Sequence, residues 1–338
     1  MRGRKINYKL IVILLILSLI LIPTALAHVP KTSQGNTSLD TAKHVHDPTK
    51  SWVIYSELKK EEEAHYYEIK LEEGERLKCS ILLPEENDFL PDLIIMGPQF
   101  SNSSDIPGHL EVPDDYGYKV IEGEKGEREY EPFTPGSYYY PVEYDEEVNQ
   151  STIYYVVVTE ENSSGKYGLA VGYEERYGMI EWIRVPWDVV TIHRWEGQSI
   201  WLIFSPMLIT FLSGAIYFIW SKQNLAPTPN YLGGWFTSIA GLSYIGTGGM
   251  MLLQMIISSM KASPGPLIIV TIIFTTIPIV LGFFTFFFGI KMELPISLGE
   301  RVKLIVLSIV AIIAWAGLII GPLLALIGAV LPLKNKKG

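Results

Sequence analysis

The sequence predicts an all-β sandwich domain outside the cytoplasm, followed by an α-helical membrane domain of four transmembrane helices. Hydrophobic residues make up 48% of the chain and charged residues only 19%, against about 25% charged in an ordinary soluble domain. Residues 28–198 hold 34 of the 36 acidic residues. Four later stretches contain no Asp, Glu, Lys, Arg or His, namely 199–221, 223–260, 262–290 and 304–333. One half of the chain therefore requires water and the other requires lipid.

The first 27 residues have the pattern of a signal peptide. Basic residues lie within residues 1–9, an apolar run covers 10–22, and Ala25-Leu26-Ala27 supplies the small residues of a cleavage site. An uncleaved signal anchor is the alternative, and both place the next domain outside. The predicted organisation is 1–27 as signal peptide or anchor, 28–49 as an extended arm, 50–175 as the β-sandwich, 176–198 as an amphipathic connector, 199–333 as the membrane domain and 334–338 as a basic tail.

Residues 50–175 alternate short β-branched or aromatic runs with turns, which is typical of an antiparallel β-sandwich. Tyr154-Tyr155-Val156-Val157-Val158 is one such run, and its residue types favour half-buried strands. Glu72-Glu73-Gly74-Glu75 has the composition of a turn. The pattern predicts strands near 51–56, 65–71, 76–83, 92–96, 117–121, 153–158 and 166–173.

Six short motifs in this domain carry a family resemblance. They are Trp52…Tyr55, His65-Tyr66-Tyr67-Glu68-Ile69, Leu71…Gly74…Arg76-Leu77, Pro91-Asp92-Leu93-Ile94-Ile95, Pro135-Gly136-Ser137-Tyr138-Tyr139 and Gly165-Lys166-Tyr167-Gly168-Leu169. In this order, over about residues 50–175, they resemble the bacterial pre-peptidase C-terminal domain. The resemblance implies a small jelly-roll-like β-sandwich that serves binding or secretion and lacks catalytic machinery. The chain departs from that pattern at His65, where the family usually has aspartate, and in the longer segment 97–135.

The connector 176–198 combines tryptophans with arginines, which is typical of a segment at the outer headgroup layer. We expect it to lie on the membrane and hold the sandwich there. His193 and Glu196, just outside the first span, are interpreted as interface anchors. The predicted membrane-interface tryptophans are Trp182, Trp187, Trp195 and Trp201.

The four predicted spans are about 199–221, 232–260, 266–290 and 304–333. Each is long enough to cross the hydrocarbon core, and four crossings would return the C-terminus to the outside. A bend at Gly321-Pro322 within the last stretch is the alternative, and it would leave the tail in the cytoplasm. No ionisable residue lies inside any span, which disfavours a transporter because ion and proton pathways usually need one. Gln254 is the single amide in the spans.

Three histidines near the predicted cleavage site form the sharpest chemical hypothesis. His28, His44 and His46 fall within nineteen residues. A mature N-terminal His28 would offer its amine and its ring together, and imidazoles of this kind suit copper(II). The alternative is that these are solvated histidines of an extended arm. Copper is therefore the one cofactor that we consider, and an extracytoplasmic copper-binding protein is the second functional hypothesis.

Two further sets of residues point to surface chemistry. Four acceptor sequons predict possible glycosylation at Asn36, Asn102, Asn149 and Asn162. The long insert 97–150 is rich in aromatic residues, which suit a partner interface or a polysaccharide platform. The alternative is that these rings cover the sandwich's own core. The candidate partner-surface residues are Tyr116, Tyr118, Tyr130, Phe133, Tyr138, Tyr139 and Tyr140.

These observations favour a membrane-anchored, non-catalytic surface protein that binds a ligand or serves as an accessory subunit. No Gly-x-Ser-x-Gly, His-Glu-x-x-His or phosphate-loop motif is present, so an enzyme is disfavoured. The acidic domain would repel phosphate, which excludes nucleic acid as a partner. The expected partners are the lipid bilayer and other membrane or envelope proteins or a surface polysaccharide. The expected location is the plasma membrane, with the N-terminal domain outside.

Overall fold

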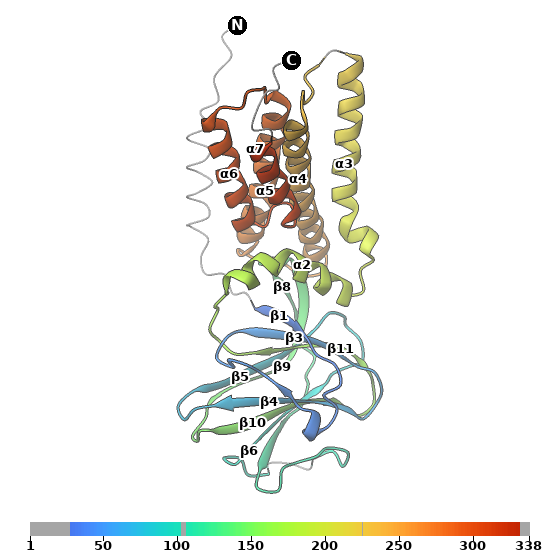
Figure 1. Ribbon diagram of the computed structural model, residues 1–338. Coiled ribbons are helices and arrows are strands. Elements are labelled where there is room, and N and C mark those ends of the chain that lie inside the picture. Colours follow the sequence, from blue (N-terminus) through green and yellow to red (C-terminus); the bar gives the residue numbers. More distant parts are fainter. Residues whose placement is uncertain (1–27, 103–105, 225, 332–338) are drawn as a thin grey trace.

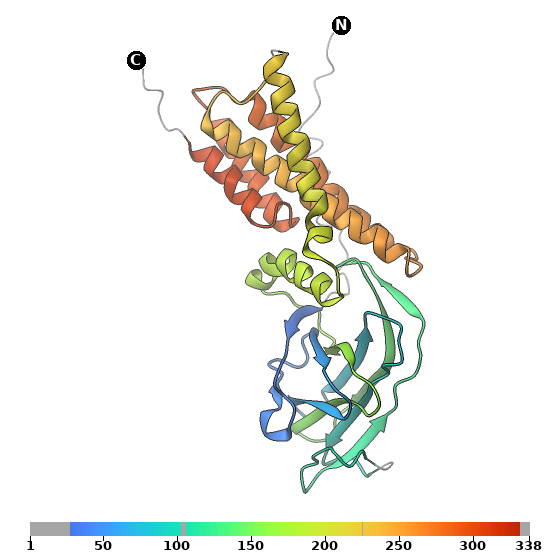
Figure 2. The same cartoon turned by 90° about the vertical axis from the view of Figure 1, so that its right-hand side faces the viewer.

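The computed structural model describes residues 28–102, 106–224 and 226–331. The predicted signal peptide or anchor and the basic tail lie outside the described residues. A β-rich region forms one end of the molecule and a bundle of helices the other, and helix α2 (Met179–Trp195) lies between them (Figure 1). A perpendicular view shows the same three layers (Figure 2).

The first sheet of the β region has six strands in the order β1-β3-β11-β5-β9-β8. Most neighbours are antiparallel, but β1 runs parallel to β3 and places Val29 opposite Trp52. The strands of this sheet are β1 (Val29–Thr32), β3 (Trp52–Leu58), β5 (Arg76–Leu83), β8 (Arg128–Glu131), β9 (Gly136–Glu147) and β11 (Gly165–Val171).

The second sheet has five strands in the order β2-β4-β10-β6-β7. Strand β10 is central and pairs with β4 and β6 in antiparallel register, whereas the short β2 runs parallel to β4. The strands are β2 (Lys43–His44), β4 (Glu63–Leu71), β6 (Asp92–Gly97), β7 (Gly117–Ile121) and β10 (Thr152–Glu160). A single turn of 3-10 helix, η1 (Leu39–Thr41), precedes β2.

All seven predicted strands are present, with ends that differ by a few residues. Two expectations about the remaining segments are corrected. The N-terminal arm 28–49 is built into the β region, because β1 and β2 each add an edge strand to a sheet. The insert 97–150 has more regular structure than its one predicted strand, because it contains β8 and β9 as well as β7. Aromatic and charged residues are mixed in β8 and β9, which obscured their strand pattern.

Side chains from both sheets meet in one hydrophobic cluster. Ile54 and Ile81 come from the first sheet, and Tyr67 and Val156 come from the second, and all are buried. Burial of apolar surface on this scale is the main force that stabilises such a region. The cluster also contains polar atoms. The hydroxyl of Tyr167 lies 2.7 Å from the hydroxyl of Tyr67 and 2.7 Å from Nδ1 of His65, the residue at which the sequence differs from the family pattern.

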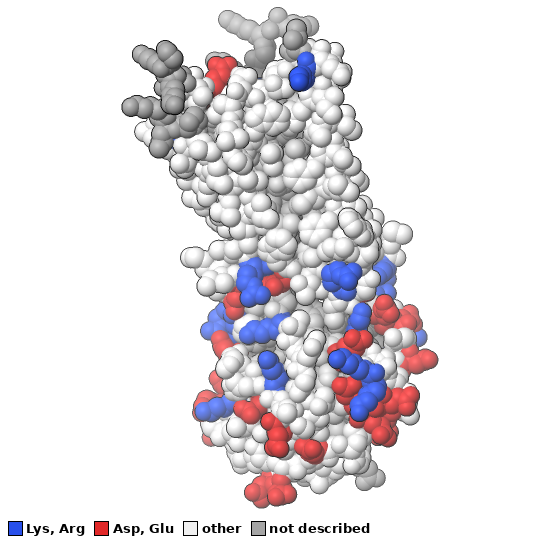
Figure 3. Space-filling model, turned by 45° about the vertical axis from the view of Figure 1, so that its right-hand side comes forward, with Lys and Arg blue, Asp and Glu red and all other residues white. Residues whose placement is uncertain are grey.

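Three helices are long and apolar enough to cross a membrane, and they identify the chain as a membrane protein. They are α3 (Ile200–Gln223), α4 (Leu232–Ser259) and α5 (Ile268–Lys291), and they confirm the first three predicted spans. Figure 3 shows that on the face in view the charged residues gather on the β region, while the helices are nearly free of charge.

Glycines allow the helices of the bundle to approach closely. A Cβ atom added to Gly241 of α4 would lie 2.3 Å from the backbone nitrogen of Phe286 and 2.7 Å from the carbonyl oxygen of Gly282, both in α5. Small residues are what helix packing in lipid requires, since no hydrophobic force drives helices together there.

The fourth predicted span is wrong as a single helix. Residues 304–333 divide between α6 (Leu298–Ile313) and α7 (Ile320–Val330), and the chain reverses between them. Trp315, Leu318 and Ile319 all have positive φ in this turn, a conformation that side chains rarely adopt. The break precedes the expected bend at Gly321 by several residues.

The two short helices return the chain to the end of the bundle away from the β region. Arg301, at the start of α6, donates a hydrogen bond of 3.1 Å to the carbonyl oxygen of Val330, at the end of α7. The turn between them lies beside α2 instead (Figure 1). This is the arrangement of the bent alternative, and not of four straight crossings.

Candidate functional site at the junction of the β region and the helices

The turn between β8 and β9, residues 132–135, is inserted into the helical region. Phe133 in this turn is only 4% exposed. The centroid of its ring lies 5.0 Å from that of Trp315, 5.2 Å from that of Phe274 and 6.2 Å from that of Trp182. Ring pairs at such separations attract one another beyond the area that they bury. Together with α2 and the turn 314–319, residues 132–135 form what we call the junction.

Hydrogen bonds reinforce the insertion of this turn. The hydroxyl of Thr271 in α5 donates to the carbonyl oxygen of Pro132 at 2.5 Å. Its oxygen can then accept from the hydroxyl of Tyr130, which lies 2.9 Å away. The β8–β9 hairpin is thus tied directly to a membrane helix.

Helix α2 is attached to the β region at both of its ends. Near its start, Glu181 pairs with Lys50 at 2.5 Å, and the lysine side chain is only 10% exposed. At its end, the indole nitrogen of Trp195 donates to the carbonyl oxygen of Ser56 at 3.0 Å. These contacts fix α2 across the top of the β region.

The four predicted interface tryptophans fall into two groups. The indole of Trp182 donates to the carbonyl oxygen of Ile313 at 3.1 Å, so Trp182 and Trp195 hold α2 to its neighbours. Trp187 and Trp201 are 40% and 80% exposed, as interfacial anchors would be.

His193 and Glu196 lie at the end of α2 and were expected to be interface anchors. They form a buried polar cluster instead. Nδ1 of His193 lies 2.8 Å from one carboxylate oxygen of Glu196, and Tyr138 of β9 donates to the other at 2.5 Å. Burial raises the pKa of Glu196, but the hydrogen bonds from His193 and Tyr138 outweigh it and leave the pKa below its usual value. The ionised carboxylate only accepts hydrogen bonds, so Nδ1 carries the proton of the His193 ring.

A pair of amides continues this cluster into the membrane domain. Gln198 donates to Glu196 at 3.1 Å and exchanges two hydrogen bonds of 2.8 Å with Gln254 of α4. The single amide of the predicted spans therefore has a partner outside them. A continuous hydrogen-bonded chain runs from β9 to α4.

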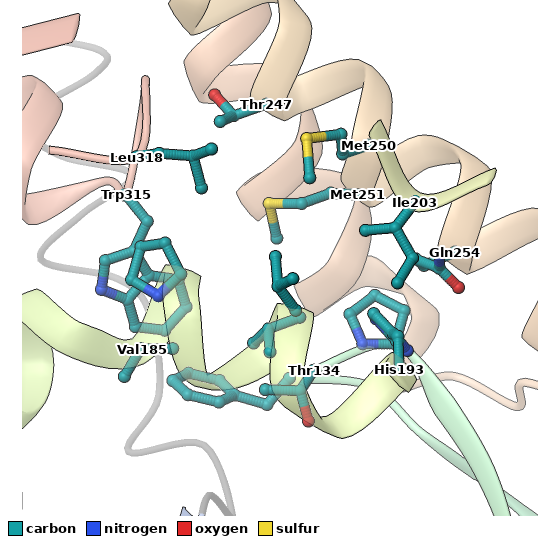
Figure 4. Close-up of a pocket in the computed structure, with 15 residues that line it drawn as sticks. Thr134, Val185, His193, Ile203, Thr247, Met250, Met251, Gln254, Trp315 and Leu318 are labelled. Carbon is teal, nitrogen blue, oxygen red and sulfur yellow. The ribbon is translucent and has the colours of Figure 1, made fainter. Parts of the chain in front are cut away.

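His193 also lines a pocket. His193 is 1% exposed, and its Nε2 has no hydrogen-bond partner among the described residues. The pocket lies between α2, α3, α4 and the two turns of the junction. Figure 4 shows His193 beside Gln254 and Ile203, with Met250 and Met251 further along the same wall.

The pocket is apolar apart from a few groups. Its walls include Val185, Met250, Met251 and Trp315. The hydroxyl of Thr247 already accepts from the backbone of Gly317 at 2.9 Å. Within the described ranges, no hydroxyl or thiol is bonded to Nε2 of His193. The arrangement is suited to accept a hydrogen bond from a bound molecule.

A second, smaller pocket lies on the β side of the junction and contains two perturbed titratable groups. Burial raises the pKa of Glu131 to about 7, although the backbone nitrogen of Phe133 donates to its carboxylate at 3.0 Å. Burial, together with the charge of Lys78, lowers the pKa of His28 to about 4. Both side chains line this pocket, beside Tyr138 and Tyr140.

The structure separates the three histidines of the copper hypothesis. His28 precedes β1 and bonds to Ser51, which precedes β3 of the first sheet. His44 lies in β2 at the edge of the second sheet, where it pairs with Glu68, and its ring lies 4.5 Å from that of His46. Within the described ranges, no three His, Cys, Asp or Glu side chains form a group able to hold a metal. Copper binding that uses a free N-terminal amine stays a prediction.

The sequons differ in accessibility. Asn36 is 1% exposed, and its amide nitrogen, the atom to which a glycan attaches, donates to the carbonyl oxygen of Tyr66 at 3.0 Å. In the folded protein this asparagine therefore supports the β region. The side chains of Asn102, Asn149 and Asn162 are exposed, and glycosylation there stays a prediction.

The aromatic residues of the insert do not form an open surface. Phe133 and Tyr130 contact the helices, and Tyr138 bonds to Glu196. The rest are buried or half-buried in the β region: Tyr116, Tyr118, Tyr139 and Tyr140. The rings therefore serve the protein's own packing, as the alternative proposed, and the hairpin's partner is the membrane domain of the same chain.

Sequence reasoning missed the pocket because its walls come from five separate segments. The spacing of His193 and Glu196, three residues apart, was a usable signal, since residues three apart share a helix face. Nothing local marked Trp315, which lies in an apolar run, and Phe133 was expected on a partner surface instead of against the helices.

No protein-family model matches the chain, and no curated protein is similar enough in sequence to count as a relative. The resemblance to the pre-peptidase C-terminal domain consequently rests on the motifs alone and stays a prediction. Function is inferred below from the geometry of this chain.

Proposed function

We propose that this protein is a membrane-anchored surface protein that displays its β region outside the cytoplasm, as a non-catalytic binding or accessory subunit of a larger envelope assembly. The observation that carries this proposal is the junction. Phe133, Tyr130 and Tyr138 attach the β region to the helices through side chains, and not only through the chain connection. A domain held in one orientation can present a binding surface at a set height and angle above the membrane.

The distribution of charge supports the proposed topology. The β region is strongly acidic, and the described helices α3, α4 and α5 carry charge only at their ends. An acidic domain stays in water beside the membrane, while the α6–α7 pair fits a hairpin that enters and leaves the bilayer from the cytoplasmic side. The end of α7 would then share the cytoplasmic side with the connection between α3 and α4.

We also propose that the two sheets form a sandwich of the pre-peptidase C-terminal type. The shared core cluster supports it, since side chains from both sheets interdigitate in such folds. The exported location rests on the signal-peptide pattern of residues 1–27.

Cysteine accessibility in intact cells tests the topology. Glu61 in the β region and Gln223 at the far end of α3 are both exposed. Burial raises the pKa of the native thiol, Cys79, so it stays unlabelled. A membrane-impermeant maleimide should label Glu61→Cys in intact cells, and Gln223→Cys only after permeabilisation. The opposite pattern, or labelling of both in intact cells, would refute the topology.

The size of the protein in native membranes tests the accessory role. The chain alone has a mass of 38.0 kDa. Extraction in mild detergent followed by mass photometry should give a particle whose mass exceeds that of the chain and its detergent belt. A particle of single-chain mass across several mild detergents would contradict the accessory role, without affecting the topology.

A further inference from the structure

The strongest unexplained feature of the molecule is the bare ring nitrogen of His193. Nδ1 carries the proton of the neutral ring and donates to Glu196 at 2.8 Å, so Nε2 has a lone pair that can accept a hydrogen bond. That atom is buried and unpartnered within the described part of the chain. A buried acceptor without a donor destabilises the fold. Because the His193 side chain lines the pocket, a molecule bound there is placed to supply that donor.

The hydrogen-bonding capacity of the pocket limits what can bind. The amides of Gln198 and Gln254 are paired with each other, and the Thr247 hydroxyl is engaged by Gly317. The remaining polar side chains of the wall are His193 and Thr134, and of these the ring nitrogen of His193 is the buried, unpartnered acceptor within the described residues. A ligand with one hydroxyl fits this wall better than a ligand with several polar groups, whose remaining groups would be buried without partners.

Charge limits the ligand further. No lysine or arginine is among the residues that line the pocket. A phosphate or carboxylate headgroup buried there would lack a compensating cation. Val185, Met250 and Met251 supply apolar surface instead, and methionine adapts readily to irregular chains. The lining helices α3 and α4 are long and apolar enough to cross the membrane, so lipid can deliver such a molecule.

We propose that this pocket binds the hydroxyl end of a neutral long-chain alcohol from the membrane, with Nε2 of His193 accepting the hydroxyl hydrogen. The apolar chain lies along Met250 and Met251 towards the bilayer. Tyr138 and Glu196 are positioning residues, because they hold the ring in the tautomer that accepts. Occupation of the site would link lipid composition to the junction that orients the β region.

Photolabelling of the full-length protein in lipid nanodiscs tests this proposal. The probe is a 1-decanol analogue that carries a diazirine on its chain, and the matched probe is its methyl ether, which has no hydroxyl donor. The alcohol should label the peptide containing Met250 and Met251 about tenfold more than the ether does. That ratio corresponds to about 1.4 kcal/mol, the size of one hydrogen bond.

Two variants and one spectroscopic measurement separate binding from general effects on the fold. His193→Phe keeps a ring but removes the acceptor, and it should reduce the ratio of alcohol to ether labelling to about one. Trp187→Phe changes an exposed ring on the same helix and should leave the ratio unchanged. In the wild-type protein labelled with ¹⁵N-histidine, the NMR signal of one histidine ring should shift when decanol is added and should not shift with the ether. This measurement does not depend on the folding of any variant.

The outcomes distinguish the alternatives. Preferential labelling by the alcohol together with the histidine shift supports the site. Equal labelling by the two probes, labelling confined to the outer surface of α3, or unchanged histidine signals in the presence of decanol would each overturn it. None of these results depends on the side of the membrane that the β region occupies or on the presence of a partner protein.

Discussion

Removal of the Phe133 ring is the most direct test of the coupling between the β region and the helices. Phe133 is 4% exposed and lies within 5.0–6.3 Å of four other rings, measured between centroids. Phe133→Ala would leave a cavity at the centre of the junction. We expect the β region itself to remain folded, because this side chain lies outside its main hydrophobic cluster.

The magnitude follows from the burial of the side chain. Truncation of a buried phenylalanine to alanine costs about 3–5 kcal/mol, and the loss falls on the docking of the hairpin against α2 and α5. A change of this size lowers the equilibrium constant for docking by roughly 10²–10⁴-fold. The hydrogen bond from Thr271 to Pro132 remains in the variant, but a single neutral bond contributes only about 1 kcal/mol.

Distance measurements between spin labels can detect the loss. Labels at Glu61→Cys and Gln223→Cys report the position of the β region relative to the bundle, and both positions are exposed. The wild-type protein should give a narrow distance distribution, and Phe133→Ala a broad one. Phe133→Leu, which preserves most of the volume, should remain narrow.

Phe100→Ala provides the matched control, because Phe100 packs on Tyr144 within the β region. That variant should lower the melting temperature of the β region without broadening the distance distribution. If Phe133→Ala leaves the distribution narrow, or if Phe100→Ala broadens it equally, the junction does not orient the β region as described.

Three further variants probe titration, helix packing and the core. The raised pKa of Glu131 makes the wild-type fold lose stability as pH rises from about 4.5 through 7. Glu131→Gln should therefore increase the free energy of unfolding by up to about 3 kcal/mol above pH 7 and have little effect near pH 4. Thermal unfolding across this pH range measures the difference. Gly241→Ala should destabilise the bundle by about 1–3 kcal/mol, since the new methyl group meets the backbone of α5. Gly299→Ala should not destabilise it, because the added methyl group has no neighbour closer than 4.0 Å. Unfolding in detergent compares the two variants. Tyr167→Phe should cost about 1–3 kcal/mol, because it removes two buried hydrogen bonds, one to His65, which keeps Ser56, and one to the hydroxyl of Tyr67. A melting temperature equal to that of the wild type would contradict this expectation.

Local sequence pattern predicted the elements whose structure depends on local chemistry. The strand Thr152–Glu160 and the helix Ile268–Lys291 are long, uniform runs, and a run of residues with one periodicity is the most reliable signal in a sequence. The turn at Trp315 was misplaced because an apolar run contains no such signal. Its positive φ values are stabilised by tertiary contacts, among them the stacking of Trp315 on Phe274 at 4.9 Å.

The site was less predictable than the fold because each of its residues has a second, more common role. Tryptophan beside arginine usually indicates a membrane interface, and the exposed Trp187 and Trp201 fit that interpretation. A tryptophan can also lie inside a protein, where its indole nitrogen requires a hydrogen-bond acceptor because it is buried. Trp195 finds its acceptor in the backbone of Ser56, which only the folded chain brings near.

Helix α2 therefore contacts two surfaces, the β region on one side and the turns of the bundle on the other. Its contacts with the β region are both polar and apolar, since Ile192 packs with Val53 and Leu82. Glu181 bonds to Lys50 on the first, while Val185 packs beside Phe133, Trp315 and Phe274 on the second. At the end of α2, the buried carboxylate of Glu196 is held by His193 and Tyr138. Because Nδ1 of the neutral ring donates to this carboxylate, Nε2 is the nitrogen left without a partner among the described residues.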